Sequence, residues 1–242
     1  MKSNIQIFAT KSELVSAVTE EIINTIEQNS QEKGICNIAL AGGNTPREVY
    51  ALLAVHHKSR VDWNRVHLFW GDERTVPQDH PDSNFSMVQQ ALLAHIAIPE
   101  RNVHRIRGEM APREAAAEYT AFLSKHFQEM PPHFDLILLG VGEEGHTASL
   151  FPGTNALEEL NQPVMAVFVP KLNTWRVTLT LPVLNAAREV VFLVAGSSKS
   201  NIVKRVMRVE QPTKALPASL VHPEKGTLHW MLDSEAAKLI QK

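Results

Sequence analysis

The chain has little of what would place it in an oxidising compartment or in a bilayer. Its 242 residues include a single cysteine, Cys36, so no intramolecular disulfide can form. No apolar run approaches the length needed to span a membrane, and residues 1–4 do not lead into a signal-type apolar segment. These absences predict a cytoplasmic protein without a membrane partner. Cys36 lies in the apolar stretch 35-ICNIALA-41 and is expected to be buried in a strand.

The sequence also lacks the charge pattern that nucleic-acid binding requires. Its 24 basic and 26 acidic residues are interspersed and leave a net charge of −2. No basic run occurs, and Lys and Arg do not alternate with aromatic residues. We therefore expect no nucleic-acid partner and a small-molecule ligand, while monomer and dimer both remain open.

Patterns for metals and covalent nucleophiles are missing as well. Asp79, His80 and Asp82 have no helical ligand spacing and are interrupted by Pro81, so a polar loop without metal is expected there. The G-x-S-x-G pattern of a serine nucleophile is absent. Water is therefore the expected nucleophile of any hydrolytic reaction.

Short apolar runs do alternate with amphipathic stretches along the whole chain, which is typical of a parallel sheet covered by helices. The expected strands are 5–9, 35–41, 66–70, 134–139, 164–169, 177–181, 190–195 and 228–232. Helices are expected after the capping box of Thr10 and Glu13, running to about residue 29, and after Thr45, Ser83, Pro112, Ser198 and Ser234. The pattern predicts an α/β fold, a single domain over 1–242 with a mainly parallel open sheet flanked by helices on both faces in a Rossmann-like three-layer arrangement.

Ligands of such sheets bind beyond the carboxyl ends of the strands. Two strand ends carry glycine turns that precede helices. Gly42 and Gly43 come before Thr45, which we expect to cap a helix together with Glu48, and this turn predicts an anion site. At the second turn, Lys199 lies in a first helical turn, where it opposes the helix dipole, and it is expected to contact a phosphate.

The third strand end is followed by the charged trio Asp72, Glu73 and Arg74, which is either a solvated turn or part of a site. Arg74 offers a planar donor fork for phosphate or carboxylate. Asp72 is expected to orient that fork or a substrate hydroxyl.

The fourth strand end leads into 140-GVGEEGHTASLFPG-153, in which three glycines have the G-x-G-x-x-G spacing of a dinucleotide site. Glu143 and Glu144 would repel a diphosphate at this position, and Pro152 leaves no room for the long helix that the motif opens. A dinucleotide cofactor is therefore disfavoured. His146 follows the glycine turn with Glu144 two residues before it, the context of a general base whose ring is held by a carboxylate.

Together these segments resemble the 6-phosphogluconolactonase family, within the superfamily that includes glucosamine-6-phosphate deaminase. The resemblance spans essentially the whole chain and is carried by 42-GGNTP-46, 71-GDERTVPQDHPDSNFSM-87, 140-GVGEEGHTASLFPG-153, 176-RVTLTLPVLNAA-187, 191-VFLVAGSSKS-200 and 216-LPASLV-221. It implies hydrolysis of the ring ester of 6-phosphoglucono-1,5-lactone in the oxidative pentose phosphate pathway, without cofactor or metal.

The resemblance also implies roles for individual residues. His146 matches the family's catalytic histidine, and Glu144 stands where the family usually has aspartate. The positions that match the substrate pocket are Gly43, Asn44, Thr45, Arg74, Arg176 and Lys199, with Asn44 in place of the serine of many members. How the charged positions divide between the phosphate and the reacting end stays open.

Two alternatives differ from this reading in testable ways. In the related deaminases the histidine segment typically continues Gly-His-Ile-Ala-Phe-Asn-Glu-Pro, whereas this chain reads Gly-His-Thr-Ala-Ser-Leu-Phe-Pro and lacks the acidic residue. A sugar-phosphate sensor of this fold would carry a DNA-binding helix-turn-helix before the sugar domain, and the first expected strand leaves no room for one. The sequence therefore favours a lactonase.

Overall fold

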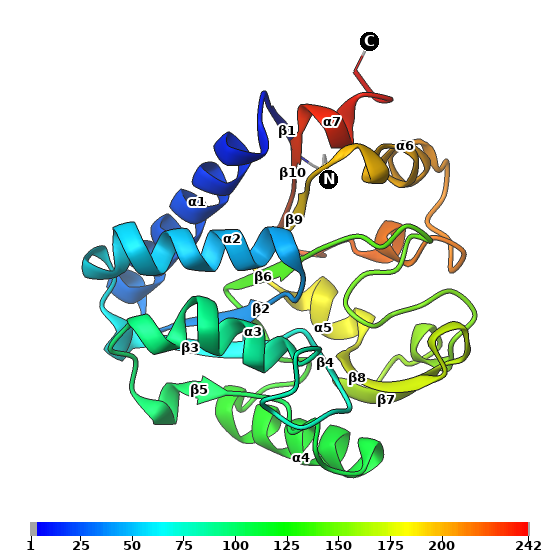
Figure 1. Ribbon diagram of the computed structural model, residues 1–242. Helices are drawn as coiled ribbons and strands as arrows, with labels where there is room; N and C mark the ends of the chain where they lie inside the picture. The colour runs from blue at the N-terminus through cyan, green and yellow to red at the C-terminus, as the bar shows by residue number, and fades with distance from the viewer. Residues whose placement is uncertain (1–3, 242) are drawn as a thin grey trace.

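The computed structural model describes residues 4–241, and its centre is a seven-stranded sheet (Figure 1). The strand order is β1-β10-β9-β6-β2-β3-β5, and every neighbouring pair is parallel. The strands are β1 (Asn4–Phe8), β2 (Cys36–Leu40), β3 (Val66–Trp70), β5 (Val103–His104), β6 (Leu136–Leu139), β9 (Glu189–Val194) and β10 (Thr227–Asp233). Cys36 is fully buried, as predicted. The predicted parallel sheet is thereby confirmed.

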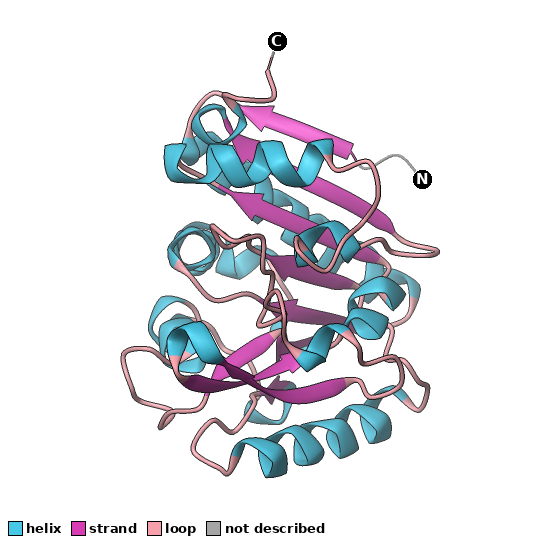
Figure 2. Ribbon diagram, turned by 90° about the vertical axis from the view of Figure 1, so that its right-hand side faces the viewer, coloured by secondary structure: helices cyan, strands magenta, loops and turns pink. Residues whose placement is uncertain are grey.

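Helices flank this sheet (Figures 1 and 2). They are α1 (Lys11–Glu32), α2 (Asn44–Leu52), α3 (Asn84–Ala91), α4 (Pro112–Phe127), α5 (Leu181–Ala186), α6 (Ser200–Arg208) and α7 (Ser234–Ala237). The predicted capping box of α1 is present, because Thr10 Oγ1 accepts a hydrogen bond from the Glu13 backbone N–H. Leu14 and Val18 of its apolar face are completely buried. No described helix combines the length and apolarity that crossing a membrane requires.

A second, antiparallel sheet of order β4-β8-β7 lies beside the first (Figure 2). Its strands are β4 (Asp72–Arg74), β8 (Thr174–Leu179) and β7 (Val164–Val169). The sequence predicted the last two strands but not their separate sheet. It also treated 72–74 as a turn or site segment, because three charged residues give no strand periodicity. Backbone pairing with β8 makes this segment a strand, with Arg74 opposite Arg176.

Several expected boundaries were off by a few residues, and three of them bear on the site. The strand expected over 177–181 ends at Leu179, because Leu181 begins α5 with Pro182 at its second position. Helix α2 begins at Asn44 with Gly43 as its N-cap, so Thr45 and Glu48 form no capping box, and Glu48 instead pairs with Lys11. A short 3₁₀ turn, Ser197–Lys199, precedes α6, which therefore starts one residue after Lys199.

Candidate active site

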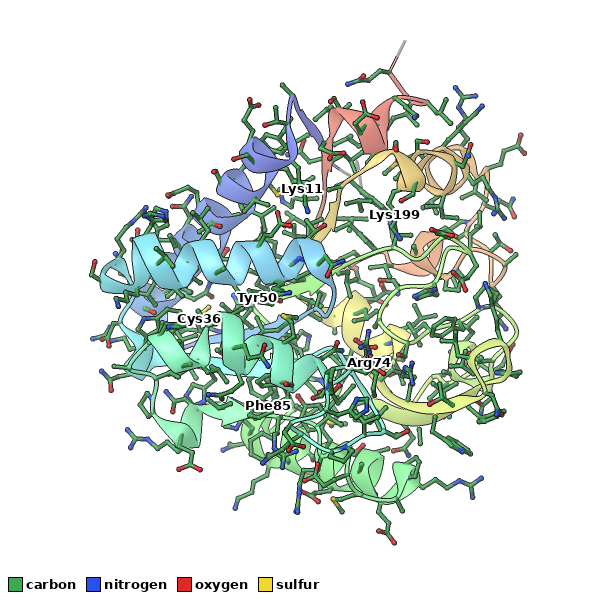
Figure 3. The ribbon with its side chains drawn as sticks, in the orientation of Figure 1. Lys11, Cys36, Tyr50, Arg74, Phe85 and Lys199 are labelled. Atoms are coloured by element: carbon green, nitrogen blue, oxygen red, sulfur yellow. The ribbon has the colours of Figure 1, made fainter. Side chains whose placement is uncertain are left out.

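A cavity of about 410 Å³ opens where β2, β3 and β6 end. It brings together four of the predicted clusters, since Gly42, Asp72, His146 and Lys199 all line it. The other described lining residues with polar side chains are Arg74, Asn84, Glu143 and Glu144. Arg74 and Lys199, labelled in Figure 3, reach this cavity from β4 and from the turn before α6. Ligand binding at the carboxyl ends of parallel strands is the usual arrangement for such sheets.

The glycine loop after β6 is shaped around His146. The Gly142 N–H donates to the His146 carbonyl at 2.9 Å, and Gly145 adopts a φ of +91°. A Cβ atom at position 142 would lie 1.9 Å from the imidazole ring, so only glycine leaves space for the histidine. The ring stacks on Phe151, with centroids 4.0 Å apart. Because turns follow this loop instead of a helix, the glycine spacing serves the histidine and gives no dinucleotide site.

Glu144 lies beside His146 as the sequence predicted. Its Oε2 is 3.3 Å from His146 Nδ1, an ion-pair distance whose geometry falls short of a hydrogen bond. Its Oε1 accepts from Lys171 Nζ at 3.0 Å. Although burial acts to raise it, the pKa of Glu144 is lowered by hydrogen bonds from its own backbone N–H and from Lys171, and also by the charge of Lys171 and that of His146 whenever its ring is protonated. Lys171 carries no motif in the sequence, and only the fold reveals this contact.

Burial lowers the pKa of His146, against the opposing charges of Glu144 and Asp72. The imidazole is therefore neutral near pH 7 and can accept a proton, while two carboxylates are close enough to stabilise the imidazolium that would form. A neutral base next to a cavity is what general-base catalysis requires.

Asp72 is held firmly and does not pair with Arg74. Its Oδ2 accepts from Ser149 Oγ at 2.6 Å, and its Oδ1 accepts from Asn84 Nδ2 at 3.2 Å. Arg74 instead donates to the Asp82 carbonyl. Of the two predicted roles for Asp72, orienting Arg74 is thus not seen in this structure. Its position in the cavity keeps the contact with a substrate hydroxyl as a prediction.

Glu73 is a structural residue that the sequence could not distinguish from its neighbours. It is 1% exposed and accepts hydrogen bonds from the backbone N–H groups of Arg74, Asn84 and Phe85 and from Ser83 Oγ. Burial raises its pKa, and the three backbone bonds partly oppose that change. These contacts fix the start of α3 against β4, which sets the positions of both cavity residues next to Glu73.

Some of the predicted anion-binding residues line the cavity or an adjoining hollow, and others do not. Gly43 and Arg74 line both the main cavity and an adjoining hollow of about 380 Å³, which Asn44 and Arg47 also line. Among the described lining residues of these two spaces, Thr45 and Arg176 do not occur. Arg176 nevertheless lies opposite Arg74, and burial together with the charge of Arg74 lowers its pKa. Two neighbouring guanidinium groups favour an anion between them.

The second glycine turn contains Gly196, whose backbone N–H is not free to bind an anion. Asp233 accepts from the Gly196 backbone N–H with both carboxylate oxygens, at 3.0 Å each, so that N–H is already paired. Lys199 is then the part of this turn that reaches the cavity.

Comparison with known proteins gives the family. The model of a family described as "Glucosamine-6-phosphate isomerases/6-phosphogluconolactonase" matches residues 9–230. The chain belongs to this family. It is 39% identical to a 6-phosphogluconolactonase of Synechocystis sp., with 98% of each chain covered, and 37% identical to that of Rattus norvegicus, with 98% of this chain and 93% of the relative covered.

Solved structures agree with this assignment. The 6-phosphogluconolactonase from Trypanosoma cruzi superposes with a TM-score of 0.88 at 30% identity, covering 100% of this chain and 98% of that one. A monomeric glucosamine-6-phosphate deaminase superposes with a TM-score of 0.81 at 20% identity, covering 98% of this chain and 99% of that one, a likeness of fold alone.

Proposed function

We propose that the chain hydrolyses 6-phosphoglucono-1,5-lactone to 6-phosphogluconate, a step of the oxidative pentose phosphate pathway. The observation that carries the proposal is the placement of neutral His146, beside ionised Glu144, in a cavity that Arg74 and Lys199 also line. A base at one part of a cavity and cations at another suit a substrate with a carbonyl to attack and a phosphate to hold. The curated relatives at 37–39% identity, named 6-phosphogluconolactonases, support the same substrate.

In the proposed reaction, His146 removes a proton from water as the water oxygen attacks the lactone carbonyl. The carbonyl π electrons move to oxygen and form a tetrahedral oxyanion. When the carbonyl re-forms, the bond from the carbonyl carbon to the ring oxygen breaks, and the imidazolium returns its proton to that ring oxygen. Glu144 stabilises the imidazolium between the two proton transfers, since its carboxylate lies 3.3 Å from Nδ1.

Cationic side chains and backbone N–H groups are proposed to bind the phosphate and to stabilise the oxyanion. Arg74, Arg176 and Lys199 are the proposed partners of the phosphate and of the oxyanion, and the N-terminus of α2 adds unpaired N–H groups, because Gly43 provides no side-chain cap. Gly42, Gly43, Asn44 and Thr45 are the proposed residues of that helix start. No cofactor and no metal ion take part in the reaction as proposed.

The deaminase alternative requires an acidic residue soon after the histidine. At the corresponding place this chain has Phe151, whose ring stacks on that of His146 with the centroids 4.0 Å apart. A phenylalanine at this place has no group that could act as the acidic residue. This difference supports the lactonase over the amino-sugar reaction.

The test is direct, because lactone hydrolysis releases one proton that a pH-stat records. The purified chain should hydrolyse freshly prepared 6-phosphogluconolactone far above the spontaneous rate and release no ammonia from glucosamine 6-phosphate. Ammonia release without lactone hydrolysis would instead identify a deaminase. Binding of 6-phosphogluconate without either reaction would indicate a sensor. A cytoplasmic location and a monomeric or dimeric state remain predictions that accompany this proposal.

A further inference from the structure

Three histidines converge in a region that the lactonase reaction does not use. His67 comes from β3, His104 from β5 and His126 from α4, and one ring nitrogen of each lies within 4.8 Å of the others. His67 is the second residue of β3, whereas the lactonase cavity opens beyond the last residue of that strand. None of the three is among the described lining residues of that cavity.

The closest contact joins His67 and His104. His67 Nδ1 lies 3.0 Å from His104 Nε2, and the two rings are nearly parallel, at 9°. Two nitrogens that bind one zinc ion at about 2.0–2.1 Å are separated by roughly 3.0–3.4 Å, depending on the angle between the bonds. The observed separation lies in this range, and an ion would replace the hydrogen bond that the two nitrogens share in the metal-free chain.

His126 completes the group and is held from outside it. Its ring centroid is 5.0 Å from that of His67 and 5.4 Å from that of His104. Its Nε2 lies 2.9 Å from Oδ1 of the buried Asn37. Histidines that bind metals usually donate their other ring N–H to an oxygen in this way, which fixes tautomer and orientation.

The surroundings of the three rings are largely apolar. Phe69 and Phe122 pack against the cluster. Neutral imidazole is the form that binds metals. All three side chains are only partly buried, so an ion can reach them.

The donor set selects the class of ion. Three neutral nitrogens without a carboxylate suit zinc, copper or nickel, whereas magnesium and calcium require oxygen ligands. Three histidines also leave one position of a tetrahedral ion for water.

We propose that His67, His104 and His126 bind one divalent transition-metal ion, which joins β5 and α4 to β3. Such a link would matter at this edge of the sheet, because β5 has two residues and pairs with β3 only at Val103 and His104. The proposed role is structural and independent of the lactonase proposal.

The test uses the full chain without an affinity tag, freed of metal by a chelator and then titrated with Zn²⁺ in a calorimeter and with Co²⁺ in a spectrophotometer. One ion should bind per chain, and Co²⁺ should give visible absorption bands of a nitrogen-ligated site. His104→Asn and His126→Asn should each weaken binding by about 10–100-fold or more. With free Zn²⁺ at about 100 times its Kd, the unfolding equilibrium constant should fall about 100-fold.

Two controls separate this site from other histidines. The double variant His56→Asn/His57→Asn removes surface imidazoles outside the cluster, and His146→Asn removes the histidine of the lactonase cavity. Both should bind one ion as the native chain does. The proposal is overturned if the native chain binds no stoichiometric ion, or if folded His104→Asn or His126→Asn binds as tightly as the native chain. Loss of the ion in His146→Asn alone would also overturn it, because that result places the ion in the lactonase cavity.

Discussion

Two histidine–glutamate pairs lie at opposite ends of the main sheet and differ in what surrounds them. His146 and Glu144 follow the carboxyl end of β6, with Nδ1 and Oε2 3.3 Å apart. His229 and Glu189 lie near the amino ends of β10 and β9, with Nε2 and Oε1 3.9 Å apart. By residue type and separation alone, either pair could be a general base with its supporting carboxylate.

The two pairs differ in the charged residue that lies next to each glutamate. Lys171 contacts Glu144, whose pKa is lowered. Burial and the neighbouring carboxylate Glu21 raise the pKa of Glu189 to about 8. At neutral pH Glu144 is ionised and can stabilise an imidazolium, whereas Glu189 is largely protonated and cannot. The environment of a pair, more than the pair itself, therefore decides whether it suits base catalysis.

The sharpest test of this comparison makes the same substitution in both pairs. His146→Asn should lower kcat by about two to four orders of magnitude, the usual contribution of a general base, and leave affinity for 6-phosphogluconate nearly unchanged. The matched variant His229→Asn should keep native turnover, because it lies at the other end of the sheet. Initial rates by pH-stat and product binding by calorimetry give both quantities. Retention of more than a tenth of native turnover in His146→Asn would exclude it as the base.

The sequence was informative about the first pair because local rules determine it. A glycine loop follows an apolar strand and carries a carboxylate two residues before the histidine, and the turn closed by the Gly142 N–H and the His146 carbonyl brings Glu144 and His146 together. The parallel strands were equally predictable from the sequence, since buried strands appear as continuous apolar runs.

What the sequence could not predict depends on residues that are distant along the chain. Lys171 reaches Glu144 across 27 positions, and Glu21 approaches Glu189 across more than 160. Strand β4 has no apolar periodicity, and only its pairing with β8 brings Arg176 opposite Arg74. The capping role of Glu73 likewise requires α3 to be packed in place.

Lys199→Ala should have the next largest effect, and a selective one. Loss of a charge-assisted bond to phosphate in a partly dry cavity costs roughly 1.5–3 kcal/mol, or about 10–150-fold in kcat/KM. Unphosphorylated gluconolactone should lose much less. Lys204→Ala, which removes a lysine of α6 outside the cavity lining, is the matched control. Equal losses of kcat/KM on both lactones would show that Lys199 does not bind the phosphate.

Glu144→Gln should cost less, roughly tenfold in kcat, because the amide can still hold the ring but cannot stabilise the imidazolium. The carboxylate raises the pKa of His146, so its removal should lower that pKa further. The base then stays unprotonated to lower pH, so the acidic limb of the kcat/KM profile should shift to lower pH. Glu143→Gln removes a carboxylate that also lines the cavity but forms no ion pair with His146, and it therefore separates the Glu144 contact from a general loss of negative charge. An unmoved profile with a native rate would reduce Glu144 to a turn residue.

Glu189→Gln should have the smallest effect on turnover, because Glu189 lies outside the cavity lining, and its effect should instead be on stability. The folded pKa of Glu189, about 8, lies above its usual value near 4.5. Between these values the folded chain holds a proton that the unfolded chain has released, so this group's contribution to stability is complete below pH 4.5 and is lost as pH rises towards 8. Glutamine resembles the protonated carboxyl at every pH. Thermal melts should therefore coincide for native and variant near pH 4.5 and separate progressively up to pH 8, with the variant more stable by about 2–4 °C for each kcal/mol recovered.

Glu144→Gln, measured alongside, should show no such gain in stability, because the Glu144 carboxylate is ionised and paired with Lys171 in the fold. A variant gap that stays constant with pH would mean that Glu189 is ionised as well, and the two pairs would no longer differ in charge.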